Sequence, residues 1–246
     1  MSYDGLEPSE LAARLEAPSC LSLAKVTSTL DIIHELAAEG APDGSVVLAD
    51  EQVAGRGRFG KRWSSPPQMG IWLGYLVRAE AQLEPGVLSL RVGLALVSTL
   101  QDLGITTSLK WPNDVMLEGR KVAGVLSEAR WMGSRVRWIA VGIGINVRGR
   151  LPPEIAAQAA TLHEVKPAIT RLEVLERLVP RLQRVSHSPK MSDTEREWYS
   201  RHDWLRGRRL RNPISGTAAG IDEDGALLVD TDRGVQRVVG GSVVTQ

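Results

Sequence analysis

The sequence lacks the features that mark a secreted, membrane-bound or nucleic-acid-binding protein. There is one cysteine, Cys20, in 246 residues, so no intramolecular disulfide can form, which fits a reducing compartment. The N-terminus, Met-Ser-Tyr-Asp-Gly-Leu-Glu, has neither the basic start nor the apolar core of a signal peptide. No apolar run is long enough to span a membrane, and a formal net charge of +1 gives no global electrostatic argument for nucleic acid. We therefore expect a cytoplasmic protein without a membrane or nucleic-acid partner.

Composition and the pattern of apolar segments and turns predict a large domain followed by a small one. The chain is 43% hydrophobic and 24% charged, as in an ordinary globular protein. After Arg206–Gly207, short apolar segments alternate with tight turns, and Asp224-Gly225 is a strong hairpin signal. We expect a short, loosely ordered lead-in over residues 1–20 with one or two helical turns at Ser9–Glu16, a main domain over 21–206, and a small β-barrel over 207–246.

Hydrophobic periodicity predicts an α+β main domain. Expected strands are Val46–Asp50, Gly70–Arg78, Thr107–Trp111, Val115–Leu117, Lys121–Arg130 and Arg135–Ile145. The first expected helix begins at Ser28, a plausible N-cap, and is ended by Gly40 and Pro42. The others cover Pro85–Leu103, Pro153–Val165, Thr170–Val185, which a Thr-x-x-Glu capping box opens, and, approximately, Glu195–Leu205. The small domain is expected to contain strands at Arg208–Arg211, Gly216–Asp222, Gly225–Asp230 and Gly234–Val239.

A glycine-rich, cationic stretch, Asp50 to Trp63, is the first candidate for a site. Gly55, Gly57 and Gly60 alternate with arginine and lysine, so the backbone can approach a ligand closely while cations face a phosphate or carboxylate. The glycines match the spacing of a dinucleotide fingerprint, but Pro66-Pro67 does not open the helix that such a fingerprint requires. The alternative is an arginine-rich surface loop without a ligand.

Two further motifs point to anion chemistry. Lys110-Trp-Pro-Asn-Asp114 ends a strand, and a hairpin would bring Asp114 near Lys121, placing a proton acceptor beside a cation. The alternative is a surface salt bridge. Gly142-Ile-Gly-Ile-Asn146 could let a ligand lie against its strand, although buried sheet glycines are common for other reasons. Our reading assigns no role to the four histidines, whose spacing is not that of metal ligands.

Over roughly residues 22–246, the sequence resembles the biotin–protein ligases. The resemblance rests on four motifs in this order and spacing: Gly-Arg-Gly-Arg, Lys-Trp-Pro-Asn-Asp, Arg-Lys-x-Ala-Gly and Gly-Ile-Gly-Ile-Asn. The resemblance implies a class II synthetase-like domain with a mixed, mostly antiparallel sheet flanked by helices, and an SH3-like C-terminal barrel. It implies the substrates biotin and ATP with Mg²⁺, the intermediate biotinyl-5′-AMP, and transfer to a lysine of a biotin carboxyl carrier protein or domain of a biotin-dependent carboxylase. The enzyme is expected to be a monomer or homodimer.

The resemblance also implies site residues. Those matched to biotin binding are Ser28, Thr29, Gln52, Arg56, Gly57, Arg58, Lys121 and Gly124. Those matched to ATP or adenylate binding are Arg58, Trp63, Asn113, Lys121 and Asn146. Lys121 and Arg58 are expected to neutralise the reacting anions, and Asp114 to act as a base, a magnesium ligand or an orienting group. No metal-ligand set is predicted.

Two departures from the family pattern bear on function. The residues before Ser28 are too few for the winged helix domain of members that also act as repressors, so the resemblance implies the ligase-only type. Leu30 stands where the family usually has asparagine. Either biotin loses a polar contact, so that Leu30→Asn would lower the KM for biotin, or Leu30 faces the core with Ile33 and Ala37.

Two other functions stay open at this point. A lipoate–protein ligase would use the same acyl-adenylate chemistry with a different acid. A biotin or nucleotide sensor would bind its ligand without turnover.

Overall fold

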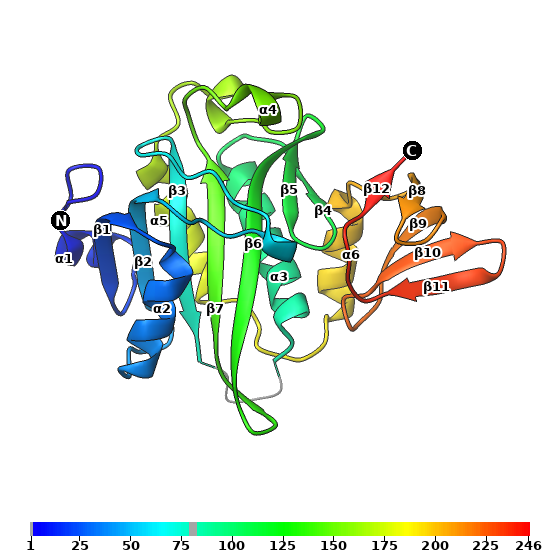
Figure 1. Ribbon diagram of the computed structural model, residues 1–246, viewed down its shortest axis with the longest axis horizontal. Helices are drawn as coiled ribbons and strands as arrows, with labels where there is room; N and C mark the ends of the chain where they lie inside the picture. The colour runs from blue at the N-terminus through cyan, green and yellow to red at the C-terminus, as the bar shows by residue number, and fades with distance from the viewer. Residues whose placement is uncertain (1, 79–82) are drawn as a thin grey trace.

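The computed structural model describes residues 2–78 and 83–246 of the chain. These residues form a seven-stranded sheet flanked by helices and a separate five-stranded antiparallel sheet at the C-terminus (Figure 1). The large sheet has the order β1-β2-β3-β7-β6-β5-β4, and all neighbouring strands are antiparallel except β1 and β2. The predicted α+β class and mostly antiparallel sheet are confirmed.

The elements lie mostly where periodicity placed them. The large sheet contains β1 (Cys20–Val26), β2 (Val46–Gln52), β3 (Gly70–Val77), β4 (Ser108–Lys110), β5 (Asp114–Leu117), β6 (Arg120–Met132) and β7 (Arg135–Asn146). The helices are α1 (Pro8–Arg14), α2 (Thr29–Ala38), α3 (Pro85–Asp102), α4 (Pro153–Ala156), α5 (Arg171–Leu182) and α6 (Asp193–His202), with 3-10 turns η1 (Arg58–Gly60) and η2 (Leu162–Glu164). The small sheet contains β8 (Arg209–Asn212), β9 (Gly216–Ile221), β10 (Leu227–Thr231), β11 (Gly234–Val238) and β12 (Val244–Thr245).

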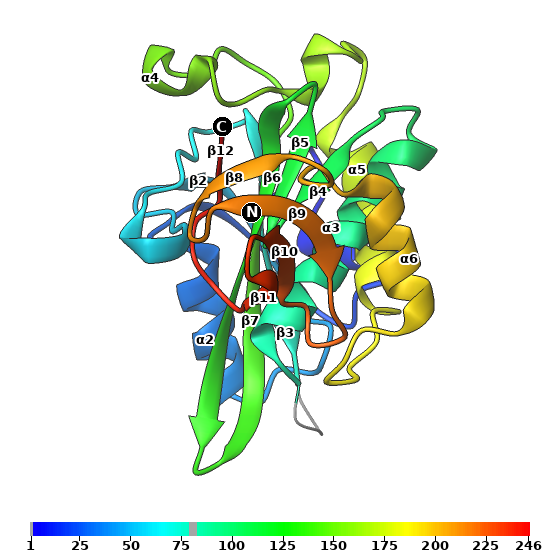
Figure 2. The same ribbon diagram turned by 90° about the vertical axis from the view of Figure 1, so that its right-hand side faces the viewer.

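The large sheet is buried on both faces, because apolar side chains point to both. Along β3, Ile71 and Leu73 join the core under α3 and α5, while Leu76 joins a second core under α2. Helix α3 packs against β6 and against both α5 and α6, so its side chains are buried on almost every side. Figure 2 shows α2 and α3 on opposite sides of the sheet. Within the described residues, no helix combines the length and apolar content needed to cross a membrane.

Helix α2 starts and ends as its sequence predicts. The Ser28 hydroxyl accepts a hydrogen bond from the Leu30 amide at 3.3 Å, which satisfies one of the free N–H groups of the first turn. Gly40 ends the helical stretch with a φ of +95°, a conformation that favours glycine. This start matters for function, because the first turn of α2 reaches the cavity described below.

The N-terminal segment is more ordered than expected. Tyr3, Leu11 and Leu15 are buried in the main core, and Asp4 forms an ion pair with Arg171 of α5. The expectation of a loosely ordered lead-in is therefore wrong for this part. Strand β1 was not expected either: Cys20-Leu-Ser-Leu-Ala-Lys-Val contains a single β-branched residue, and the strand is fixed by parallel pairing with β2.

The helix expected over Pro153–Val165 is also wrong. It ends after one turn at Ala156, and Ala159 then forms a parallel bridge with Lys121. The Lys121 amide donates to the Gln158 carbonyl at 2.8 Å, and the Ala160 amide donates to the Lys121 carbonyl at 2.9 Å. Tertiary pairing with β6 thus replaces local helix formation.

The small sheet packs on the main domain through its β9–β10 turn. Gly225 lies against Leu90 of α3, and the Trp111 indole N–H donates to the Gly225 carbonyl at 2.9 Å. Its first four strands match the predicted segments, while β12, which pairs with β8, was not expected. The pairing leaves residues 241–243, just before β12, beside the cavity of the main domain.

Candidate active site

A cavity of about 560 Å³ lies over the middle of the large sheet. Its walls come from the first turn of α2, the glycine-rich loop after β2, strands β5 to β7, and Gly241–Val243 before β12. All the residues matched above to biotin, adenylate or catalysis line it. The structure therefore brings together side chains that are spread over more than a hundred positions of the sequence.

The floor of the cavity contains glycines of two neighbouring strands. Gly144 of β7 pairs with Gly124 of β6, and Gly142 lies two residues earlier on β7. A Cβ on Gly144 would come within 2.5 Å of the Trp63 ring. Gly144 thus allows the close approach of the Trp63 ring, and Gly142 that of the Leu30 side chain.

In this structure the group that approaches the floor is the Trp63 indole, which comes from the glycine-rich loop. The ring lies against Gly124 and Gly144, and the Lys121 Nζ lies 4.9 Å from its centroid. Its N–H is buried and has no hydrogen-bond partner in the described part of the chain. Buried indole N–H groups usually find an acceptor. The loop itself therefore fills part of the cavity.

The α2 end of the cavity is a set of interlocked polar groups. The Gln52 side-chain oxygen accepts from the Thr29 amide at 2.9 Å and from the Thr29 hydroxyl at 3.2 Å. Its nitrogen donates to the Ser65 hydroxyl at 2.8 Å. Ser28 and Thr29 are almost fully buried, as is Leu30, whose side chain lies against Gly142.

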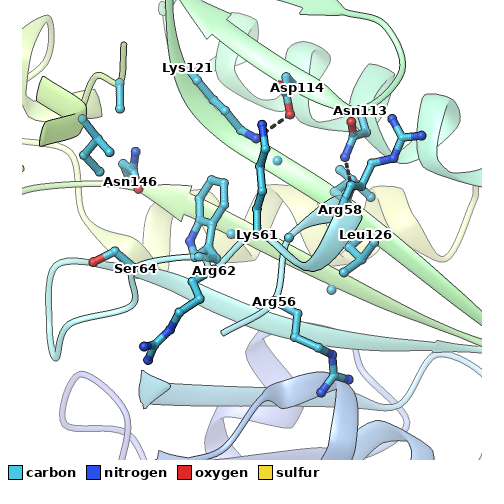
Figure 3. Close-up of a pocket in the computed structure, with 18 of the residues that line it drawn as sticks. Arg56, Arg58, Lys61, Arg62, Ser64, Asn113, Asp114, Lys121, Leu126 and Asn146 are labelled. Carbon is cyan, nitrogen blue, oxygen red and sulfur yellow. Dashed lines mark hydrogen bonds and ion pairs between the residues drawn. The ribbon is translucent and has the colours of Figure 1, made fainter. Parts of the chain in front are cut away.

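The predicted approach of Asp114 and Lys121 is confirmed. Lys121 Nζ lies 2.5 Å from Asp114 Oδ1, and both side chains are roughly 30% exposed to solvent, 31% and 27% respectively. Figure 3 shows the two groups facing one another over the cavity. The pair is neither buried away from ligands nor on the outer surface, so a substrate in the cavity would meet both charges.

The two asparagines are held by backbone groups. The Asn113 side-chain nitrogen donates to the Val125 carbonyl at 2.5 Å, and that of Asn146 donates to the Ala160 carbonyl at 3.1 Å. Each leaves its side-chain oxygen as the group available to a ligand.

The two arginines of the glycine-rich loop differ in their partners. Arg56 binds Asp31 and Glu128 and is directed away from Lys121 in Figure 3. The Arg58 guanidinium makes one long hydrogen bond, 3.4 Å, to the Gly241 carbonyl of the C-terminal domain. Burial lowers the pKa of Arg58, and the negative charge of Asp114 opposes this. Of the two arginines, Arg58 is thus the one that faces the cavity charges, and Lys61 of the same loop extends toward Lys121 and Asp114 in Figure 3.

The cavity is strongly electropositive. Among the described residues that line it, Asp114 is acidic and seven are cationic: Arg56, Arg58, Lys61, Arg62, Lys110, Lys121 and Arg148. Burial lowers the pKa of Lys110, with Asp114 opposing and Lys121, Lys61 and Arg208 adding to the decrease. Such a site stabilises a polyanion. In the described ranges, no group of three or more His, Cys, Asp or Glu side chains could hold a metal ion.

Several lining residues were not among the predicted site residues. Lys110 opens the Lys-Trp-Pro-Asn-Asp motif, and Gly142 and Gly144 belong to the third motif, so the sequence carried a signal for each. Gly241–Val243 carried none, because only the tertiary packing of the small sheet brings these residues to the cavity.

Comparison with known proteins agrees with this geometry. The chain matches the Biotin/lipoate A/B protein ligase family over residues 22–146 and the Biotin protein ligase C terminal domain over residues 206–245. It is 36% identical over 230 residues to the Biotin--[acetyl-CoA-carboxylase] ligase of Paracoccus denitrificans, with 84% of this chain and 92% of that protein covered. It is 32% identical over 231 residues to the Bifunctional ligase/repressor BirA of Bacillus subtilis, with coverages of 89% and 71%. Its fold is similar to that of the biotin protein ligase from Aquifex aeolicus in complex with biotin and ATP, with a TM-score of 0.73, 30% identity, and coverages of 93% and 99%.

Proposed function

Because the chain belongs to the Biotin/lipoate A/B protein ligase family, we propose that it is an ATP-dependent biotin protein ligase. It converts biotin and ATP into biotinyl-5′-AMP and pyrophosphate, and then transfers biotin to a lysine of a biotin carboxyl carrier protein or domain. The observation that carries the proposal is the cavity with seven cations, one carboxylate and a glycine floor. The first reaction joins two anions, and such a site offsets their repulsion.

In the first step, a carboxylate oxygen of biotin attacks the α-phosphorus of ATP and pyrophosphate leaves. We assign Lys121 and Arg58 to the developing charge on the phosphate oxygens, where one preorganised donor contributes about 3–4 kcal/mol. The polar set at the start of α2 would hold the other end of biotin. The proposed biotin residues are Ser28, Thr29, Gln52, Arg56, Gly57, Arg58, Lys121 and Gly124, and the proposed adenylate residues are Arg58, Trp63, Asn113, Lys121 and Asn146.

Trp63 must move before a ligand can use the whole floor, since its ring lies on Gly124 and Gly144. The movement would carry the loop with it and would expose the indole N–H to a new acceptor. Exclusion of water by the reordered loop would protect the acyl-phosphate anhydride from hydrolysis.

Magnesium fits the site as an ion delivered with ATP. Mg²⁺ is usually bound through one or two carboxylates together with substrate phosphates, and Asp114 offers one carboxylate beside the proposed phosphate position. When bound, the ion would neutralise charge on the leaving pyrophosphate. Asp114 would then orient either the ion or Lys121.

In the second step, the amine of the carrier lysine attacks the acyl carbon, AMP leaves, and the amine loses a proton. Asp114 is the acidic side chain among the described cavity residues and is our candidate for accepting or orienting that proton. We expect the reaction in the cytoplasm, by a monomer or homodimer, without a nucleic-acid or membrane partner.

The choice of acid is tested by ATP–pyrophosphate exchange with biotin, lipoate or octanoate as the acid. The proposal predicts exchange with biotin alone. Exchange driven by lipoate would assign the chain to the lipoate branch of the family, and binding of biotin without any exchange would indicate a sensor.

A further inference from the structure

Arg56 is the most heavily bonded side chain of the glycine-rich loop. Its Nε donates to Glu128 Oε1 at 3.1 Å and its Nη2 donates to Glu128 Oε2 at 3.2 Å, in a two-point pair with β6. Its Nη1 donates to Asp31 Oδ1 of α2 at 2.5 Å, and the Thr27 hydroxyl donates to the other oxygen of Asp31 at 2.7 Å. A guanidinium held at three nitrogens by two carboxylates is fixed in place.

Glu128 is oriented in turn by His34 of α2. The Trp138 indole N–H can only donate, and it lies 3.0 Å from His34 Nδ1, so Nδ1 must be the acceptor. Neutral His34 therefore carries its proton on Nε2, which lies 3.2 Å from Glu128 Oε2 and donates to it. His34 and Trp138 are both largely buried, with 11% of the His34 side chain exposed. Hydrogen bonds therefore connect four side chains in a continuous chain: Trp138 donates to His34, and His34 and Arg56 both donate to Glu128.

Holding Arg56 holds the loop, because the loop folds as a narrow hairpin around it. The Gly57 amide donates to the Lys61 carbonyl at 2.7 Å, and the Trp63 amide donates to the Gly55 carbonyl at 2.8 Å. Arg56 lies between these two bonds and pairs with Arg62. The hairpin tip carries Arg58, and its second arm carries Trp63. Fixing Arg56 to β6 and α2 therefore keeps both residues close to the cavity, while the Trp63 ring can still leave the glycine floor.

We propose that Glu128 and His34 are positioning residues of the ligase, which hold Arg56 and thereby keep the loop over the cavity while the adenylate is bound. The inference rests on the proposed function and adds to it a control of adenylate retention from outside the cavity. Arg56 acts in this assignment as the anchor of the loop. Neither Glu128 nor His34 is among the described residues that line the cavity, so the chemical step itself should not depend on them.

The test uses Glu128→Gln in the full-length protein. Three N–H donors point at this carboxylate, while glutamine offers one acceptor oxygen and an amide group that would face a donor. Glu223→Gln is the matched control, because it removes an exposed ion pair between Glu223 of the C-terminal domain and Lys190 of the main domain, away from the loop. Two readouts are taken: the rate of trypsin cleavage at Arg58, Lys61 and Arg62 without ligands, and the rate at which preformed biotinyl-5′-AMP is released.

We expect Glu128→Gln to increase both rates about tenfold, the effect of losing hydrogen bonds to a charged group, while kcat for pyrophosphate exchange at saturating substrates stays within about threefold. His34→Ala should give part of the effect, and His34→Gln, whose amide nitrogen can reach the place of Nε2, should restore retention. The double variant Arg56→Gln/Glu128→Gln should release adenylate no faster than the faster single variant. Glu223→Gln should behave as the wild type.

Unchanged cleavage and release in a folded Glu128→Gln variant would overturn the inference. A fall in kcat equal to the rise in release rate would also overturn it, since it would place Glu128 in the chemical step. Failure of the proposed function looks different: the wild-type protein would form no biotinyl-5′-AMP, while the cleavage assay would still report whether Glu128 holds the loop.

Discussion

At the residue scale, the proposed chemistry depends on a lysine paired with a carboxylate inside a positive cavity. Lys121 is fixed through its backbone by Gln158 and Ala160, and through its side chain by Asp114. A cation held in this way needs little reorganisation as charge develops on the phosphate.

We therefore predict that Lys121→Ala lowers the rate of biotin-dependent pyrophosphate exchange by at least about 10²-fold. The fold should survive, because about 31% of the Lys121 side chain is exposed and its backbone bonds remain. Exchange is measured at saturating biotin and ATP, and thermal unfolding is the control. Exchange at the wild-type rate would remove Lys121 from the reaction.

Leu30 is buried, with 2% of its surface exposed, and it packs with Ile33 and Ala37. This favours the core interpretation over a lost contact to biotin. We predict that Leu30→Asn lowers the free energy of unfolding by about 2 kcal/mol or more, because it removes apolar contacts and buries an amide among apolar groups. Urea unfolding measures the change. Full stability together with a several-fold lower KM for biotin would instead support the ligand interpretation.

Single residues were predicted well where a motif fixed their neighbours. The approach of Asp114 and Lys121 follows from a four-residue strand and a tight turn, both local in sequence. The partners of Arg56 could not be predicted in this way, because Asp31 and Glu128 lie on elements 25 and 72 positions away. Nothing in the spacing of these residues indicates that they meet.

At the element scale, the glycine-rich loop is the part that couples binding to chemistry. It is anchored at Arg56, places Trp63 on the glycine floor, and presents Arg58 toward Asp114 and Gly241. Arg58 is the described link between the loop tip and the C-terminal domain.

Arg58→Gly should consequently shorten the lifetime of bound biotinyl-5′-AMP. We expect faster escape of the intermediate and labelling of lysines on bystander proteins, because escape would compete with directed transfer. Blotting for biotin after incubation with serum albumin as the bystander and a carrier domain measures this. If only the carrier is labelled and the intermediate is retained as in the wild type, the glycine-rich loop does not retain biotinyl-5′-AMP through Arg58.

The anchoring of the loop should weaken in acid. The hydrogen bond from His34 is the first cause that lowers the pKa of Glu128, with Arg56 adding to it while burial opposes. A carboxyl group whose folded pKa lies below its unfolded pKa stabilises the anchored state above the unfolded value, and this contribution is lost as the pH falls through the folded pKa. The groups facing Glu128 are Arg56 and His34, and Asp31 shares Arg56.

Pepsin cleavage near Phe59, followed from about pH 5 to about pH 3, tests this dependence. The Glu128→Gln variant should be cleaved faster than the wild type at the upper end, and the two rates should converge as the pH falls. A ratio that does not change with pH would show that ionisation of Glu128 does not hold the loop.

Most elements were predicted correctly because their signals are local. The start of α2, the capping box of α5 and the β5–β6 turn all follow from residues within a few positions of one another. Strand β1 and the segment after Ala156 were not predicted, because parallel pairing with β2 and bridging to Lys121 decide their conformations. The residue pattern of one segment does not predict pairing with a segment that is distant in the sequence.

At the scale of the whole molecule, the C-terminal domain completes the cavity. Gly241–Val243 form part of its wall, while Leu210, Leu227 and Val229 belong to the same core as α3. The domain is therefore both a packing partner of the main domain and a part of the site.

Deleting residues 207–246 should raise the KM for ATP by more than about tenfold while changing the Kd for biotin less, because the proposed biotin residues all precede residue 125. The deletion also uncovers core residues, so Ser242→Trp, which fills the same wall without shortening the chain, is the companion variant. Wild-type ATP kinetics in both variants would leave the C-terminal domain without a role in the site.

The proposed activity of this cavity is to make biotinyl-5′-AMP and to deliver biotin to a carrier lysine. The most direct measurement is the intact mass of a purified biotin carboxyl carrier domain after incubation with this protein, biotin, ATP and Mg²⁺. We expect a mass increase of one biotinyl group, absent without ATP and absent with a carrier whose acceptor lysine is replaced by arginine. With the Lys121→Ala variant the modification should form at least about 10²-fold more slowly than with the wild type. An unmodified carrier in the complete reaction, or modification by Lys121→Ala at the wild-type rate, would show that the cavity does not perform this reaction.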